Sequence, residues 1–473
     1  MERADVVVIG AGFGGLGAAT AAAEQGARVV LLERVGYPGG CASTFTRGGA
    51  RYEAGATVLA GLGEGQALRD VVDRYALPLT LERVDPALTL RWPTGSFTIP
   101  SDRSAFVDAV AALPGAPPGV RRAFAEQQRV ADALWATLDR PELLPPWGVR
   151  QLPGLLAHVA HTFGAWPALA RHAGRPMSAW LHSHGLSGFE PLRRILDPLC
   201  QITVQVGTDQ AEAPFALAAI DFLFRGVRSV RGGVGALATG LCDVIERLGG
   251  SVRFHRPATA LTRGPDGWVV HTKRGPIGAR QVVANVAPHV LRDWLGPTPR
   301  LDAQVARVET GWGAVVAYHT LDDAFPAGPA HLDLVADPAA PLADGNHVLC
   351  SVGEHRPGQP RTATSSTHVT SRDRAAVEAA QRALRATVRA LAPELAQATR
   401  SELPASPRTF ARFTGRPGGW VGGIPRRAGL GAYAELWPRA VAPGLWAVGD
   451  SVLLGQSALA AFVGGRHTAR CFG

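Results

Sequence analysis

The chain has 473 residues, of which 46% are hydrophobic and 18% are charged. That length exceeds the roughly 250–300 residues at which one hydrophobic core usually divides, so we expect more than one domain, and the composition excludes a disordered chain. The formal net charge is +9, but the arginines that carry it are spread along the chain. This spread argues against a nucleic-acid partner and leaves attraction to a membrane surface open.

Five scattered cysteines without CxxC spacing predict neither a disulfide framework nor a zinc site, and they indicate a reducing compartment. We expect solvated helix histidines, and no metal site, at His158, His161, His182 and His184, because the neighbouring sequence offers no carboxylate or cysteine ligands. No uncharged apolar run reaches about 18 residues, so no membrane-spanning helix is predicted. The expected location is the cytoplasm, with peripheral contact to the inner face of the membrane left open.

The first predicted elements are a strand, a helix and a second strand. Residues 6–9 are a β-branched run of strand length. Residues 16–25 are rich in small residues that favour a helix, and residues 29–32 are predicted to form a second strand. The second strand ends at Glu33. This order predicts a βαβ unit with the helix beginning at the end of the first strand.

Three glycines separate the first strand from the helix in the order G-x-G-x-x-G: Gly10, Gly12 and Gly15. Gly10 suits the sharp turn, Gly12 lets the backbone approach a pyrophosphate, and Gly15 permits close contact between helix and strand. Glu33 lies where a carboxylate accepts hydrogen bonds from an adenosine ribose. The unit therefore predicts a dinucleotide site, although this motif alone does not separate NAD from FAD.

Two further stretches favour FAD. Residues 34–62 are glycine-rich and turn at residues 38–40, where an NAD dehydrogenase would continue with further strand–helix units. Near the C-terminus, Gly449 and Asp450 stand between a short strand at 445–448 and a glycine-interrupted helix. An aspartate at that place suits the ribityl and pyrophosphate region of a flavin nucleotide, whereas the alternative interpretation is a simple helix cap.

The cofactor-binding pieces are not contiguous, so we expect interleaved domains. Residues 85–225 are predicted to be mostly helical, and residues 301–420 alternate as strands with one helix. The predicted division is a FAD-binding domain in three parts (1–84, 226–300 and 421–473), a helical substrate domain (85–225) and a substrate-domain sheet (301–420).

Several motifs along the chain resemble the phytoene desaturase-like flavoproteins, which include carotenoid desaturases and carotenoid cis-trans isomerases. They are "PGGCAST" (38–44), "EAGAT" (53–57), "RGGVGALATGL" (231–241), "VVANVAP" (282–288), "PRTFARFTGRPGGWVGGIP" (407–425) and "VGDS" (448–451). "PGGCASTF" followed by "GATVLAGL" is most similar to the carotenoid 3,4-desaturase branch. The resemblance implies an α/β fold, in which a Rossmann-like FAD-binding domain of the glutathione reductase/amine oxidase type is interleaved with a substrate domain of mixed sheet and helices.

Carried over residue by residue, the resemblance implies cofactor contacts at Gly10, Gly12, Gly15, Glu33, Arg34, Gly39, Gly40, Gly449 and Asp450. It also places the backbone of Ala258 at the adenine and the turn that contains Thr57 beside the flavin ring. No catalytic residue stands out. Glu53 is the carboxylate nearest that turn in the sequence, and a structural hydrogen bond to glycine-rich backbone is favoured over proton relay.

The implied activity is FAD-dependent desaturation of a carotenoid or another apolar polyisoprenoid by hydride transfer. Oxygen, a quinone or another electron acceptor then reoxidises the flavin. The alternatives are a flavin-dependent carotenoid cis-trans isomerase and, from another class, an isoprenoid-binding escort protein without redox activity. An amine oxidase is disfavoured because no aromatic pair stands beside the terminal motif.

Residues 143–174 mix apolar residues with arginines and histidines. The apolar members are Trp147, Leu152, Leu155, Leu156, Phe163 and Trp166. An apolar face edged by cations suits an amphipathic segment in the headgroup layer of a membrane. Ordinary core packing explains the pattern almost as well, so both interpretations stay open.

Overall fold

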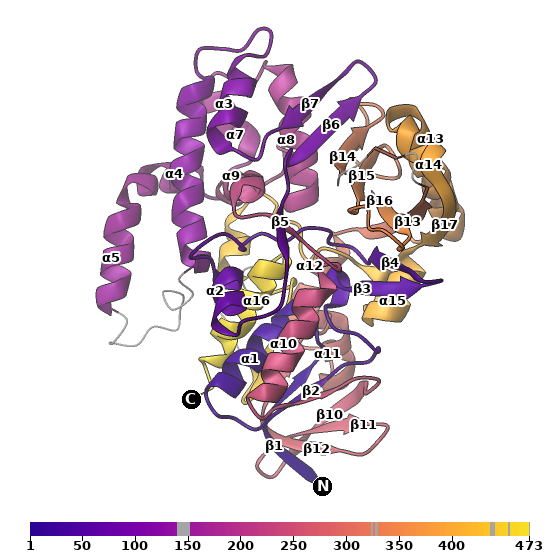
Figure 1. Cartoon of the computed structure of the whole chain (residues 1–473). Helices are drawn as coiled ribbons and strands as arrows, with labels where there is room; N and C mark the ends of the chain where they lie inside the picture. The colour runs from indigo at the N-terminus through magenta and orange to yellow at the C-terminus, as the bar shows by residue number, and fades with distance from the viewer. Residues whose placement is uncertain (140–151, 323–324, 327–329, 436–439, 453–454, 473) are drawn as a thin grey trace.

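The computed structural model describes residues 1–139, 152–322, 325–326, 330–435, 440–452 and 455–472. Two large sheets and a group of helices make up the described part of the chain (Figure 1). The first sheet lies near both chain ends, and the second lies under α13 and α14 at the right of the view. This arrangement agrees with the predicted α/β class, and the division into five segments stays a prediction.

The helices and strands run as follows. The α-helices are α1 (Phe13–Glu24), α2 (Ala67–Arg74), α3 (Arg103–Ala111), α4 (Val120–Asp139), α5 (Leu152–Thr162), α6 (Trp166–His172), α7 (Met177–Ser183), α8 (Glu190–Thr203), α9 (Ala213–Ala219), α10 (Gly235–Arg247), α11 (Pro288–Leu295), α12 (Pro299–Glu309), α13 (Arg374–Leu391), α14 (Pro393–Ala398), α15 (Pro407–Thr414) and α16 (Ala458–Ala469). The strands are β1 (Glu2–Ile9), β2 (Val29–Leu32), β3 (Thr44–Arg47), β4 (Ala50–Glu53), β5 (Leu81–Arg83), β6 (Leu88–Trp92), β7 (Gly95–Ile99), β8 (Arg228–Val230), β9 (Ser251–Arg253), β10 (Ala258–Gly264), β11 (Gly267–Thr272), β12 (Ile277–Ala284), β13 (Gly313–Leu321), β14 (Ala330–Val335), β15 (His347–Val352), β16 (Arg361–Val369), β17 (Thr399–Ala405), β18 (Ala440–Ala442) and β19 (Leu445–Ala447).

The first sheet is built on parallel strands from distant parts of the sequence. Its order is β10-β11-β12-β1-β2-β9, and β19 pairs with β12 and β18. β1 runs parallel to both β2 and β12, and β12 runs parallel to β19. The carboxyl ends of these strands therefore meet at one edge of the sheet, the edge at which open α/β sheets bind ligands.

Helix α1 explains why the segment after the first glycines has almost no bulky side chains. Its residues from Phe13 to Ala23 are all buried, and it packs against α16 from the C-terminal segment. A helix without a polar face is stable in water only where protein covers all of its sides, so α1 lies inside the protein. The first sheet and the two ends of the chain thus form one unit, as Figure 1 shows for α1 and α16.

The second sheet has the order β17-β13-β16-β15-β14-β6-β7. β13 runs from Gly313 to Leu321, inside the region where the sequence predicts strands. The prediction that residues 85–225 are mostly helical is wrong at its start, because β6 and β7 form a hairpin and β6 pairs in parallel with β14. That pairing joins residues more than two hundred positions apart, which local patterns do not reveal.

The helical region, α3 to α9, surrounds its own apolar core and contains the second error of the sequence interpretation. His184 is not a solvated helix histidine: its Nε2 lies 3.1 Å from Oε1 of Glu126, and His172 shares the same oxygen at 3.2 Å. Glu126 lies in α4, far in the sequence from both histidines, so these contacts form only in the tertiary structure. No group of potential metal ligands occurs within the described ranges, and the five cysteines are all free.

Glu53 has the structural role that the sequence favours. At the end of β4, its Oε1 accepts a hydrogen bond from the backbone N–H of Val234 at 3.0 Å. Its Oε2 accepts from Oγ1 of Thr44 on β3 at 2.9 Å. These bonds connect the β3–β4 hairpin to the turn before α10. Burial raises the pKa of Glu53 to about 7, and the two hydrogen bonds oppose part of that shift.

We predict that Glu53→Gln flattens the pH dependence of thermal stability. Because the folded-state pKa is raised from 4.5 to about 7, the stabilisation from the Glu53 proton is present below pH 4.5 and is lost as pH rises through 7. The difference in melting temperature, Glu53→Gln minus wild type, should therefore increase by a few degrees from pH 5 to pH 8. Exposed Glu64→Gln is the control and should show no gain; an equal difference at both pH values would contradict the prediction.

Candidate functional site

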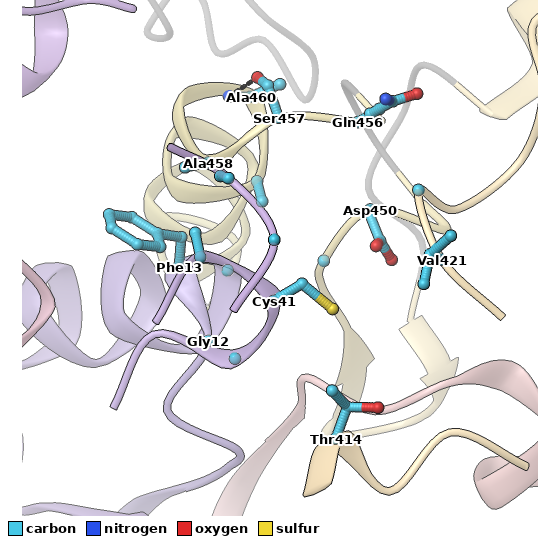
Figure 2. Close-up of a pocket in the computed structure, with 18 of the residues that line it drawn as sticks. Gly12, Phe13, Cys41, Thr414, Val421, Asp450, Gln456, Ser457, Ala458 and Ala460 are labelled. Carbon is cyan, nitrogen blue, oxygen red and sulfur yellow. Dashed lines mark hydrogen bonds between the residues drawn. The ribbon is translucent and has the colours of Figure 1, made fainter. Parts of the chain in front are cut away.

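A single large chamber opens along the carboxyl edge of the first sheet and reaches the second sheet. Its volume is about 2010 Å³, and its lining includes residues from β1, β2, β13, β15, β16 and the start of α16. Ordinary small-molecule pockets have volumes of roughly 300–1,000 Å³, so this chamber has room for two ligands. Figure 2 shows Gly12, Cys41 and Asp450 around one part of it, with α16 starting near Ser457.

The glycine turn lies tightly against Asn285, the residue that follows β12. Nδ2 of Asn285 donates to the carbonyl oxygen of Gly10 at 3.3 Å. A side-chain carbon at Gly12 would lie 2.6 Å from the same nitrogen, so any larger residue would displace Asn285. The absence of a side chain at Gly12 thus lets Asn285 pack against the turn at the N-terminus of α1, the place at which a dinucleotide fold holds a pyrophosphate.

Glu33 is fixed at the end of β2 by backbone donors. Its Oε2 accepts from the N–H of Ala11 at 2.8 Å and its Oε1 accepts from the N–H of Val35 at 3.0 Å. The residue is buried, and burial raises its pKa, whereas the backbone hydrogen bonds oppose the shift. Such a carboxylate, placed in the chamber wall, is suited to accept hydrogen bonds from ribose hydroxyls.

Asp450 forms an ion pair inside the chamber. Its Oδ2 lies 2.8 Å from Nη2 of Arg416, which comes from the loop after α15. Burial opposes the charge on Arg416, but the carboxylate of Asp450 outweighs it and raises the pKa of the guanidinium. Gly449, with φ of +116°, makes the turn from β19 that leads into Asp450. The Asp450 interpretation as a plain helix cap is wrong, because Ser457 caps α16 instead.

The structure brings almost all of the predicted cofactor residues to this one chamber. Those that line it are Gly10, Gly12, Glu33, Arg34, Gly39, Gly40, Thr57, Ala258, Gly449 and Asp450. Gly15 is not among the lining residues. It lies against the backbone of Gly10, so its contribution is close packing between α1 and β1. The individual contacts of these residues with a cofactor stay proposals.

Sequence reasoning did not single out two residues of the site. Asn285 stands inside the quoted "VVANVAP", and its place after a predicted strand was the available signal. Arg416 stands inside "FTGRPGG", where nothing in the local pattern points to Asp450. Both contacts join segments that are far apart in the sequence, so only the tertiary structure shows them.

The part of the chamber beside the second sheet differs in character. Its lining combines apolar residues with uncharged polar ones: the apolar ones include Leu134, Leu169, Ile202, Val316 and Leu403, and the polar ones include Ser351, Ser366 and Thr367. Among the described lining residues, the carboxylates are Glu33 and Asp450, both already placed in the nucleotide part. The second part therefore offers hydrocarbon surface to an uncharged ligand.

These features define a class of protein: a flavoprotein oxidoreductase with a dinucleotide site on a parallel sheet and a second sheet that lines the same chamber. The comparisons agree. The chain belongs to the family described as flavin containing amine oxidoreductase, which matches residues 13–408. FAD is the cofactor, since the family is one of flavin enzymes and the turn at Gly12 and the placement of Glu33 fit its nucleotide part.

Two relatives are informative. The chain is 30% identical over 258 residues to a phytoene desaturase (neurosporene-forming) of Cereibacter sphaeroides, covering 53% of this chain and 46% of that protein. The match thus spans about half the length of that relative. The chain is 25% identical over 515 residues to prolycopene isomerase 2, chloroplastic, of an Oncidium hybrid cultivar, covering 97% of this chain and 82% of that protein. The predicted desaturase-like family is confirmed.

A solved structure shows the same fold. Putrescine oxidase bound to putrescine has a TM-score of 0.62, with 15% sequence identity, and the match covers 99% of this chain and 98% of that one. At this identity the likeness concerns the fold, and it supports the interleaved arrangement of the two sheets.

We predict that Gly12→Val and Asp450→Ala each lower the FAD content of the purified protein severalfold. The valine side chain displaces Asn285 from the turn at the N-terminus of α1, and the alanine removes a hydroxyl acceptor and leaves Arg416 unpaired. FAD released on denaturation, per chain, is the measurement. Gly188→Val is the control because that exposed glycine has open space around it. Wild-type FAD content in the two site variants would contradict the assignment.

Proposed function

We propose that this protein is an FAD-dependent desaturase of a carotenoid or a related polyisoprenoid. The observation that carries the proposal is the second part of the chamber, which has many apolar lining residues and, among its described residues, no carboxylate. Such a lining favours a long uncharged substrate over a small polar one. The printed names of the two relatives, both carotenoid enzymes, support the same substrate class.

In the proposed reaction the substrate loses two hydrogens from adjacent saturated carbons. FAD, when bound, would supply the acceptor for one hydrogen as hydride, and the other hydrogen leaves as a proton to a weak base such as water. Oxygen, a quinone or another acceptor then takes up the electrons. The residues of the chain hold the two ligands: Glu33 and Asp450 on the nucleotide, and the apolar face of β13 and β17 on the hydrocarbon. Val316 and Leu403 on that face exclude water and align the substrate, so the main contribution of the protein is orientation.

An amine substrate fits this chamber poorly. An aromatic pair does line it, since the rings of Phe215 and Tyr433 lie 5.3 Å apart, but the guanidinium of Arg426 lies over Phe215 at 5.2 Å. A fixed cation at that place repels an ammonium group. The ion pair with Arg416 also neutralises Asp450. The chamber thus differs in charge from a site for protonated amines.

The second candidate is a redox-neutral carotenoid isomerase. It is favoured by one observation: the prolycopene isomerase matches nearly the whole chain, whereas the desaturase matches about half of it. The escort alternative without redox activity is disfavoured, because the nucleotide half of the chamber is intact at Gly12, Glu33 and Asp450.

The two enzymes differ in whether the substrate loses hydrogen. We predict that anaerobic incubation of the FAD-loaded protein with a linear carotenoid, without an acceptor, gives about one equivalent of product per bound FAD. The product should be lighter by two hydrogens and absorb at longer wavelength, and added quinone should restore turnover. Many turnovers that require prior reduction of the flavin and give product of unchanged mass would contradict the desaturase and support the isomerase.

We also propose that the protein attaches peripherally to a membrane through residues of α5, α6 and the short turn between them. Leu156, Phe163 and Trp166 are 65%, 69% and 47% exposed, although they are large and apolar. Trp166 also lines the chamber, so the apolar surface continues into it. Exposed Arg171 and Arg175 edge this surface. The proposal provides an apolar route from lipid to the chamber.

The other members of the predicted amphipathic stretch do not bear on this proposal. Trp147 lies outside the described residues, and so do the side-chain positions of Leu152 and Leu155. No described helix is long and apolar enough to cross a membrane. The exposure of Leu156, Phe163 and Trp166 supports the membrane interpretation over core packing.

We predict that Phe163→Ser with Trp166→Ser weakens binding to vesicles of anionic phospholipid about tenfold or more, with FAD content unchanged. Flotation of the FAD-loaded protein with the vesicles is the measurement. Phe413→Ser is the matched control, because Phe413 is 46% exposed but belongs to α15, away from α5 in Figure 1. Equal flotation of all three proteins would contradict the proposal, and loss of FAD from the double variant would indicate core packing.

A further inference from the structure

Three side chains from distant segments form a continuous hydrogen-bonded network in the chamber wall. Oγ1 of Thr57 lies 2.8 Å from Oγ of Ser351 on β15. The same oxygen of Ser351 lies 3.0 Å from Nδ1 of His331 on β14. All three residues line the chamber. This network, Thr57–Ser351–His331, connects two hydroxyl groups with an imidazole, and the cofactor site does not account for it.

The second sheet fixes the inner part of the network. His331 and Ser351 are directly opposite each other in the antiparallel pair of β14 and β15. Side chains that are directly opposite in such a pair lie on the same face of the sheet and contact each other. Ser351 is only 6% exposed, so its hydroxyl has little access to water. The contact between hydroxyl and imidazole is therefore set by strand pairing.

His331 has more hydrogen-bonding and basic capacity than its contacts use. Its Nε2 is buried and has no hydrogen-bond partner in the described part of the chain. Burial lowers the pKa of His331 to about 4, so the ring is uncharged at neutral pH. An uncharged imidazole with one nitrogen on a hydroxyl is able to take up a proton through that hydroxyl.

The proposed desaturation releases a proton in apolar surroundings. Loss of a hydride beside a polyene leaves a positive charge that conjugation spreads, and the hydrogens on the next carbon become strongly acidic. A weak base is then sufficient, but it has to be close to the substrate, because a charge is costly in apolar surroundings. The carboxylates among the described lining residues, Glu33 and Asp450, are already bound in the nucleotide half. The base is therefore sought among uncharged groups.

We propose that Thr57, Ser351 and His331 carry the substrate proton away from the carbon that loses it. The C–H bond breaks, and its electron pair completes the new double bond. The proton passes to Oγ1 of Thr57, Thr57 passes its own hydroxyl hydrogen to Ser351, and Ser351 passes its hydrogen to Nδ1 of His331. One C–H bond is thus replaced by one N–H bond, and neither hydroxyl changes its charge.

The position of Thr57 suits the first transfer. Thr57 belongs to the turn that the sequence resemblance places beside the flavin ring, where the hydride would leave the adjacent carbon. After the reaction, the protonated ring of His331 is a strong enough acid to return its proton through the same hydroxyls when water enters behind the departing product. The inference rests on the proposed function, in which FAD is the hydride acceptor.

The test follows flavin reduction in a single anaerobic turnover of the FAD-loaded protein with the linear carotenoid of the desaturation assay. Thr57→Val removes the first hydroxyl at nearly constant volume, and Thr57→Ser keeps it. His331→Asn keeps a polar partner for Ser351 but has no basic nitrogen. Thr98→Val is the control, because Thr98 is exposed on β7 and is not among the lining residues.

Thr57→Val and His331→Asn should each slow flavin reduction about 100-fold, with dissociation constants for the carotenoid within about twofold of the wild-type value. Thr57→Ser should recover most of the rate that Thr57→Val loses, and Thr98→Val should react at the wild-type rate. If Thr57→Val also loses FAD, His331→Asn still decides the question, because a structural role of the network predicts the full rate for that variant.

The wild-type reaction should also be slower in D2O than in H2O. The hydrogens on the substrate carbons do not exchange with water, so this slowing reports the hydroxyl hydrogens of Thr57 and Ser351. Equal rates in the two solvents, or a full rate in His331→Asn, would overturn the inference and leave the proposed function standing if the product has lost two hydrogens. A wild-type product of unchanged mass would overturn both.

Discussion

The close approach of two backbone segments to Asn285 is the constraint on which the cofactor site depends. The glycine turn after β1 leaves room for the amide of Asn285 on one side, and Gly449 after β19 does so on the other. A side-chain carbon at Gly449 would lie 2.7 Å from Oδ1 of Asn285. The N-termini of α1 and α16 are consequently held at fixed positions beside the carboxyl edge of the sheet, and Glu33 and Asp450 take their places from the same edge.

Charge divides the chamber into two environments. Arginines gather at the nucleotide half, where Arg34, Arg256 and Arg416 line the wall and suit the phosphates of a dinucleotide. The other half combines hydrocarbon side chains with buried imidazoles whose charged forms are disfavoured, as the lowered pKa of about 4 for His331 shows. Part of the net positive charge thus serves the cofactor, while the described lining of the substrate half has no carboxylate.

Local patterns were sufficient where the chemistry of the site is local. The strand, turn and helix around Gly10 and Gly12, the position of Glu33 and the strand before Gly449 are each encoded within a few residues, and the structure brings them together. Contacts across the sequence were not predictable in this way. The pairing of β6 with β14, the Arg416–Asp450 ion pair and the sharing of Glu126 by two histidines depend on which segments meet in space.

The first sheet cannot be completed until its strands β18 and β19 have been made. Its central strand β1 is made before the other strands of the sheet, whereas β19 and the α16 partner of α1 are made after them. At roughly 5–20 residues per second, α1 waits on the order of 20–90 s for α16. During that time its apolar surface, which has no polar side, is open to chaperones or to other nascent chains. Protein yield in a host is therefore governed by how well this early segment is shielded during synthesis.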